Sequence, residues 1–204
     1  MALLCTSGSA LLNYYPAIAE AFYSDIPLIV ISADRPIERI DIGDGQTIRQ
    51  KNVFENHILY SASLYSEVVP SEEITDPTIV QKIQESRRHN EQEINKALNM
   101  AIEQKGPVHI NVPFYEPLYE IVEKLSVHPI AISPKRTLPE ITNEELAPYA
   151  RLWNNSKRKM ILVGVLHPNA VEQHFLDTIG NSQDVIVFTE TTKLHNNDKM
   201  TMRK

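Results

Sequence analysis

A turn of small residues near the start of the sequence could bind an anion or a polar ring. Thr6–Ser9 follows the apolar residues Ala2–Cys5 and precedes a helical pattern that begins at Ala10. Backbone N–H groups at a helix N-terminus attract negative charge and polar ligands. A tight turn that only packs a helix on a sheet would have the same residues, and the spacing favours neither interpretation.

Two catalytic loops are excluded at this turn. A nucleophile elbow has the pattern Gly-x-Ser-x-Gly, whereas Cys5 and Ser9 occupy the outer positions around Ser7. A Walker phosphate loop requires a lysine after the turn, and none follows. Cys5 has no histidine at an informative spacing, so we expect a buried, unreactive thiol.

Arg35 is a candidate for binding an anionic ligand. It follows the apolar run Leu28–Ile31, at a position where open α/β sheets bind their ligands. A guanidinium there suits a bidentate contact to a carboxylate or phosphate. The alternative is an ion pair with Asp34, Glu38 or Asp41 on a solvated loop, and the two interpretations weigh equally.

No metal site is predicted. Enzymes that use thiamine diphosphate bind magnesium with Gly-Asp-Gly followed by Asn-Asn about one helix later, but after Gly43–Gly45 the Asn-Asn pairs at 154–155 and 196–197 are too distant. Glycine and aspartate are common turn residues, so we interpret Gly43–Gly45 as a turn. His109 lies in a predicted strand, where a hydrogen-bonded core histidine is the simpler interpretation.

The elements that must position these residues alternate between strand and helix. Apolar residues recur at three- and four-residue steps from Ala10 to Tyr23, which predicts an amphipathic helix. Leu28–Ile31 is too apolar for a half-exposed strand and predicts a central strand of a parallel sheet. Ala2–Cys5, this helix and this strand form a βαβ unit.

Further elements follow in the same rhythm. A short helix is predicted over about 47–56, and 61–69 is ambiguous, with a short strand as one interpretation. After Pro77, a long amphipathic helix continues to a stop at Gly106. Val108–Val112 alternates as a strand.

A linker and a second α/β region complete the pattern. Three prolines without a helical period indicate an extended linker at about 126–140. Thr142 and Glu145 form a capping box that opens a helix ending near Asn155. The remaining predicted elements are a strand at 160–164, a helix at 168–179 and a strand at 185–188. We expect both sheets to be incomplete in this sequence.

Composition narrows the class of protein. The chain has 204 residues, of which 42% are hydrophobic, enough for a packed core. Its 20 Lys+Arg and 26 Asp+Glu give a formal charge of −6, which disfavours nucleic acid as a partner. Polar residues and a proline interrupt the longest uncharged stretch, Met1–Ala19, so no membrane span is predicted. The single cysteine and the lack of a basic leader predict a cytoplasmic location.

Four motifs resemble those of one family, in the family's order. They are Thr6-Ser7-Gly8-Ser9-Ala10 with Asn13 and Tyr15-Pro16-Ala17, Ala33-Asp34-Arg35-Pro36, Gly43-x-x-Gln46-Thr47-Ile48-Arg49-Gln50, and Asn111-x-Pro113-Phe114-x-Glu116-Pro117-Leu118-Tyr119. They resemble the thiamine-diphosphate-dependent 2-succinyl-5-enolpyruvyl-6-hydroxy-3-cyclohexene-1-carboxylate synthase family of menaquinone biosynthesis. The resemblance covers about 2–120 by motif and 140–190 by layout only.

The resemblance implies a parallel-sheet, three-layer α/β/α fold. An incomplete pyrimidine-binding domain would occupy 1–125, a linker 126–140, and part of a Rossmann-like central domain 141–204. The family's activating glutamate lies before Thr6 and its metal ligands lie in a third domain. No catalytic or metal-binding residue is therefore assigned here, and the chain alone is expected to be an inactive fragment that does not bind the cofactor.

The resemblance also implies a reaction and its site residues. The family decarboxylates 2-oxoglutarate on thiamine diphosphate, with Mg²⁺ or Mn²⁺, and adds the succinyl-semialdehyde carbanion to isochorismate. The parent enzyme would be a homo-oligomer whose active sites form between subunits. By position, Arg35 and Gln46 would bind substrate. The cofactor-binding residues would be Thr6, Ser7, Gly8 and Asn13.

Two hypotheses from other classes stay open. The chain could be a small α/β module that binds an anionic metabolite at Thr6–Ser9 or Arg35 without catalysis. It could also have only a structural role, in which incomplete sheets pair their open edges between chains.

Overall fold

A computed structural model shows two compact units, Met1–Arg136 and Thr137–Lys204. The described residues are 1–66, 76–115, 121, 123, 128–133, 141–164, 166 and 170–189. No helix within these ranges has the length and apolar character needed to cross a bilayer.

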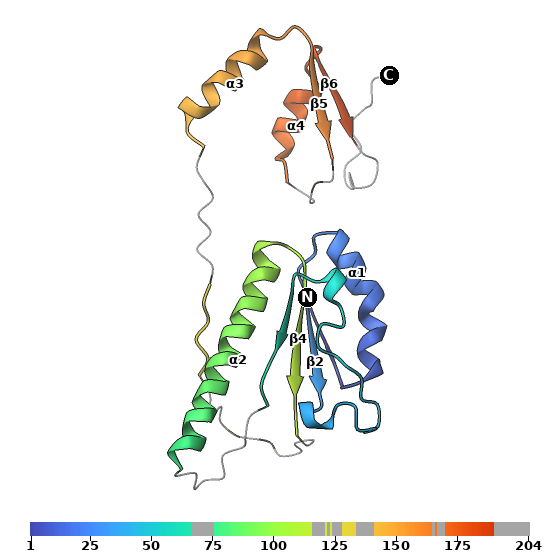
Figure 1. Ribbon diagram of the computed structural model, residues 1–204. Coiled ribbons are helices and arrows are strands. Elements are labelled where there is room, and N and C mark those ends of the chain that lie inside the picture. Colours follow the sequence, from blue (N-terminus) through green and yellow to red (C-terminus); the bar gives the residue numbers. More distant parts are fainter. Residues whose placement is uncertain are drawn as a thin grey trace. The chain divides into compact units, whose positions relative to one another are not determined.

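The first unit is built on a four-stranded parallel sheet. The strands stand in the order β1 (Ala2–Cys5), β2 (Leu28–Asp34), β4 (Pro107–Pro113) and β3 (Tyr60–Ser63), and each neighbouring pair is parallel. Helices α1 (Tyr15–Tyr23) and α2 (Pro77–Glu103) cover opposite faces of this sheet (Figure 1). The predicted α/β fold with a parallel sheet is confirmed.

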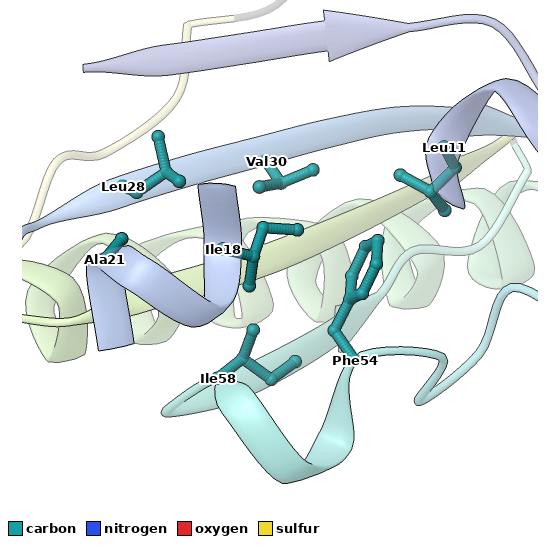
Figure 2. Close-up of a cluster of buried hydrophobic side chains, with 7 residues drawn as sticks. All are labelled: Leu11, Ile18, Ala21, Leu28, Val30, Phe54 and Ile58. Carbon is teal, nitrogen blue, oxygen red and sulfur yellow. The ribbon is translucent and has the colours of Figure 1, made fainter. Parts of the chain in front are cut away.

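The core has one half on each face of the sheet. On the α1 face, Ile18 and Phe54 point toward one another below Leu28 and Val30 of β2 (Figure 2). On the α2 face the buried cluster is Ala62, Ala97, Ala101, Val108 and Ile110. Side chains of β2 alternate between the two faces, so β2 is covered on both, as an inner strand of a parallel sheet must be. The predicted central strand is confirmed.

The helix predicted from Ala10 to Tyr23 forms in two parts. A 3₁₀ helix, η1, spans Ser9–Tyr14, and α1 begins only at Tyr15. Pro16 has no N–H and cannot donate to the carbonyl of Leu12, four residues earlier. The N–H of Tyr15 takes that carbonyl instead, three residues back, which is the 3₁₀ pattern.

The helix predicted at 47–56 is wrong. This segment forms turns, followed by the short 3₁₀ helix η3 (Glu55–His57). Gln46 and Asn52 have φ values of 62° and 59°, which a right-handed helix does not allow. Gln50 and Phe54 are completely buried, so the segment folds inward to seat these two side chains. Of the ambiguous stretch at 61–69, Tyr60–Ser63 forms β3, while 67–69 lies outside the described residues.

The long helix α2 is capped by Asp76, whose carboxylate accepts the N–H of Thr78 at 2.8 Å. It also binds part of the predicted linker along its side. Asn95 contacts the backbone of the linker twice, donating to the carbonyl of Ile130 at 2.9 Å and accepting the N–H of Ile132 at 2.7 Å. The backbone of 128–133 is therefore held by helix side chains rather than by a strand.

The second unit pairs β5 (Lys159–Val163) in parallel with β6 (Val185–Thr189). Its helices are α3 (Asn143–Asn155) and α4 (Gln173–Gly180). The predicted strands and helices are confirmed in type and order. However, α4 begins at Gln173 rather than at Pro168, and Pro168 itself lies outside the described residues.

The predicted capping box of α3 is confirmed, and it supports a stability prediction. Thr142 Oγ1 accepts the N–H of Glu145 at 3.3 Å, and Glu145 Oε2 accepts the N–H of Thr142 at 2.9 Å. We expect Thr142→Ala to destabilise α3 by about 1 kcal/mol, because one N-terminal N–H loses its acceptor. Amide hydrogen exchange in α3 measures this loss. Thr142→Ser keeps the hydroxyl and should match the parent; equal exchange rates in both variants would contradict the prediction.

Candidate functional site

The residues that the sequence singled out meet at one edge of the first sheet. Because β1, β2 and β4 run parallel, their carboxyl ends lie at the same edge. The turn at Thr6–Gly8 follows β1, Arg35 follows β2, and Asn111 lies near the end of β4. Open parallel sheets bind their ligands at this edge.

The backbone of Gly8 lies directly against Gln46. Gly8 has φ 94° and ψ −155°, a conformation that essentially only glycine adopts. A Cβ atom at Gly8 would stand 1.7 Å from the carbonyl oxygen of Gln46. The structure thus brings together the turn expected to bind cofactor and the loop expected to bind substrate.

A layer of buried polar side chains lies at the same end of the sheet. Ser32, Asp34, His109, Asn111 and Gln50 are all buried. Asn111 donates to Asp34 Oδ2 at 2.6 Å, and its Oδ1 accepts from Ser32 at 3.1 Å and from Gln50 at 2.9 Å. Because buried polar groups are costly unless paired, this network fixes the ends of β2 and β4 relative to each other.

His109 is a core residue, as predicted, and hydrogen-bonded on one side of its ring. Nε2 lies 2.7 Å from Ser32 Oγ, while Nδ1 has no partner in the described part of the chain. Burial lowers the pKa of His109 to about 4, so the imidazole is neutral at physiological pH. In the tautomer that lets the Ser32 hydroxyl donate to Asn111, Nε2 carries the ring proton and donates it to Ser32.

Gln50 is the residue that sequence reasoning missed. It stands in one of the four family motifs, but no pattern marked it as buried or functional. Its Oε1 accepts the N–H of Gly8 at 2.6 Å, and its Nε2 donates to the carbonyl of Ala33 at 2.9 Å. Its place in that motif was the only signal in the sequence. The burial of Gln50 and of the neighbouring Phe54 is visible only in the structure.

Arg35 pairs with Asp44, which was not among the partners predicted for it. Its Nε lies 3.5 Å from Asp44 Oδ2, and each side chain is about a third exposed, 35% and 33% respectively. The alternative partners Asp34, Glu38 and Asp41 were therefore wrong. Asp34 accepts the backbone N–H of Arg35 instead, at 2.8 Å.

Asp41 has a partner of its own, which accounts for its absence from the Arg35 site. Arg49 Nη2 lies 3.0 Å from Asp41 Oδ2, at the exposed side of the loop. The turn Gly43–Gly45 thus supplies an acidic neighbour for Arg35.

Within the described residues no group of three or more His, Cys, Asp or Glu could hold a metal ion.

The remaining predicted residues differ in exposure. Thr6, Asn13 and Gln46 are exposed, whereas Ser7 and Gly8 are buried. Cys5 is half-buried rather than buried, and burial raises its thiol pKa, which disfavours the reactive thiolate. The exposed residues can contact a ligand, and the buried ones determine the shape of the turn.

Comparison with known proteins agrees with the fold of the first unit. Residues 1–62 match the family model for the N-terminal TPP binding domain of thiamine pyrophosphate enzymes. This part of the chain is therefore similar to the N-terminal domain of that class of enzymes.

Curated relatives narrow the similarity to one kind of synthase. The chain is 65% identical over 192 residues to the 2-succinyl-5-enolpyruvyl-6-hydroxy-3-cyclohexene-1-carboxylate synthase of Christiangramia forsetii, covering 94% of this chain and 33% of that protein. Identity to the synthase of Flavobacterium psychrophilum is 50%, covering 94% and 31%. Identity to that of Bacillus pumilus is 34%, covering 81% and 27%. The chain is similar to synthases of this name and spans about a third of the length of these relatives.

Proposed function

We propose that this chain is part of a synthase that decarboxylates 2-oxoglutarate and joins the product to isochorismate, using thiamine diphosphate. The observation that supports this best is the contact between Gly8 and Gln46 at the carboxyl edge of the sheet, with Arg35 after the neighbouring strand. The matched relatives carry the name of such a synthase. We also propose, on the family resemblance, a homo-oligomeric parent enzyme in the cytoplasm.

The turn after β1 suits the ring part of the cofactor. Thr6 and Asn13 are exposed and offer a hydroxyl and an amide to a polar ring. Ser7 and Gly8 are buried, and the Gly8 N–H is used by Gln50, so these two residues shape the turn. When bound, thiamine diphosphate supplies an electron sink for decarboxylation and carbon–carbon bond formation.

The described residues do not suit the cation that accompanies the diphosphate. They contain no cluster of three or more metal-ligating side chains. On the family resemblance, Mg²⁺ or Mn²⁺ would be held by a part of the synthase beyond the third that this chain matches. We propose accordingly that the 204-residue chain alone is inactive.

Arg35 and Gln46 would bind the substrates, both of which carry carboxylates. Arg35 Nε has no hydrogen-bond partner within the described ranges, and the guanidinium is partly accessible. Its neighbour Asp44 lies 3.5 Å away and neutralises the arginine until a substrate carboxylate arrives. Gln46 is exposed on the same loop and would donate a hydrogen bond to that carboxylate.

The test of this proposal is Arg35→Ala in a complete enzyme. A full-length Christiangramia forsetii synthase, its matching third replaced by this chain, provides the measurement. We expect KM for isochorismate to rise about tenfold to thirtyfold, because a charge-assisted hydrogen bond at a partly solvated site is lost. Steady-state kinetics with 2-oxoglutarate held in excess checks this.

The control for this test is Arg49→Ala. Arg49 lies on the same loop, but its side chain is 80% exposed and pairs with Asp41. It should leave KM within twofold of the unsubstituted graft. Equal effects of the two substitutions would show that loss of positive charge on the loop, and not a contact of Arg35, changes KM. A folded graft without any turnover would refute the proposed function itself.

A further inference from the structure

Gln50 joins three strand ends through one buried side-chain amide. Its Oε1 accepts the N–H of Gly8 at 2.6 Å. Its Nε2, which carries two protons, faces the carbonyl of Ala33 at 2.9 Å, Asn111 Oδ1 at 2.9 Å and Ser32 Oγ at 3.2 Å. The side chain is completely buried, so water does not compete for these contacts.

The contacts of Gln50 reach both halves of the proposed site. Gly8 belongs to the turn after β1, on the cofactor side. Ala33 lies in β2, two residues before Arg35 on the substrate side, and Asn111 lies in β4. Since β1 and β4 are not neighbours in the sheet, Gln50 supplies a link that the backbone ladder between strands does not.

We propose that Gln50 is a positioning residue. It fixes the turn Thr6–Gly8 relative to the carboxyl end of β2, which Arg35 follows. This inference rests on the proposed function. An amide is required because one end must accept a proton from Gly8 while the other donates protons to Ala33 and Asn111. Glutamate at this position keeps the acceptor and loses the donors, whereas methionine, of similar size, loses both.

These two substitutions separate the two halves of the link. In Gln50→Glu the hydrogen bond from the Gly8 N–H remains, and the hydrogen bonds to Ala33 in β2 and Asn111 in β4 are lost. We therefore expect KM for isochorismate to rise about tenfold in the grafted synthase, with the dissociation constant for thiamine diphosphate within twofold of the parent. In Gln50→Met we expect both quantities to rise about tenfold.

Two measurements complete the test without turnover. Calorimetric titration of the grafted synthase with thiamine diphosphate and Mg²⁺ gives the dissociation constant in the absence of substrate. Amide hydrogen exchange of the 204-residue chain reports on Gly8, whose N–H should exchange at least tenfold faster in Gln50→Met and unchanged in Gln50→Glu. Thermal unfolding confirms that each variant is folded at the assay temperature.

The outcomes distinguish this inference from the function on which it rests. If the unsubstituted graft is active and both variants keep KM and the dissociation constant within twofold, Gln50 is only a structural residue and the inference is wrong. If KM and the dissociation constant rise equally in Gln50→Glu and Gln50→Met, the two ends of the Gln50 amide do not act separately on substrate and cofactor, and the inference is wrong. A folded but inactive unsubstituted graft refutes the proposed function, and the inference with it.

Discussion

Gly8→Ala should destabilise the first unit by about 4 kcal/mol. Two costs add at this position. The conformation at φ 94° and ψ −155° is strained for any residue with a Cβ, at about 1–3 kcal/mol. The new Cβ would also stand 1.7 Å from the carbonyl oxygen of Gln46, so one of the two backbone segments must move. Amide hydrogen exchange of β1 and β2 measures the loss.

Gly43→Ala is the matched control for this substitution. Gly43 also has a positive φ, 83°, but a Cβ there would meet no atom within 4 Å. It should cost only about 1 kcal/mol, from backbone strain alone. If the two variants are equally stable, the contact between Gly8 and Gln46 does not hold the loop against the turn.

Much of the fold could be predicted from the sequence because its signals are local. The apolar run at Leu28–Ile31 and the long amphipathic pattern after Pro77 each determine an element without help from distant residues. The segment at 47–56 misled the prediction because its structure depends on tertiary contacts. Gln50 and Phe54 are buried against other elements, and a helix would not have placed both side chains there.

The candidate site was predictable in its residue types and less so in its partners. The strand pattern predicted that the Arg35 guanidinium lies just after β2. Its partner Asp44 belongs to a turn whose path no local pattern determines. The link through Gln50 joins residues far apart in sequence, 42 positions to Gly8 and 61 to Asn111. The separate assignment of 1–125 and 141–204 to named domains stays a prediction.

The buried imidazole of His109 should make the stability of the first unit depend on pH. Burial lowers its pKa to about 4, whereas an unfolded histidine titrates near 6.5. Below pH 6.5 the unfolded chain binds a proton that the folded chain does not, so stability falls as the pH falls, until the folded pKa is reached. The total loss is about 3 kcal/mol, of which about 2 kcal/mol falls between pH 7.5 and pH 5.

His109→Gln isolates this contribution from that of the carboxylates. Glutamine can donate to Ser32 but does not titrate, so the variant should lose about 2 kcal/mol less than the parent between pH 7.5 and pH 5. Amide hydrogen exchange of β2 and β4 at both pH values gives the two differences. His174→Gln, at a histidine whose side chain is 63% exposed in the second unit, controls for losing a histidine as such. The same pH dependence in parent and His109→Gln would mean that the ring is protonated, or reached by water, in the folded chain. In that case water would reach the polar layer at the carboxyl edge more easily than its burial indicates.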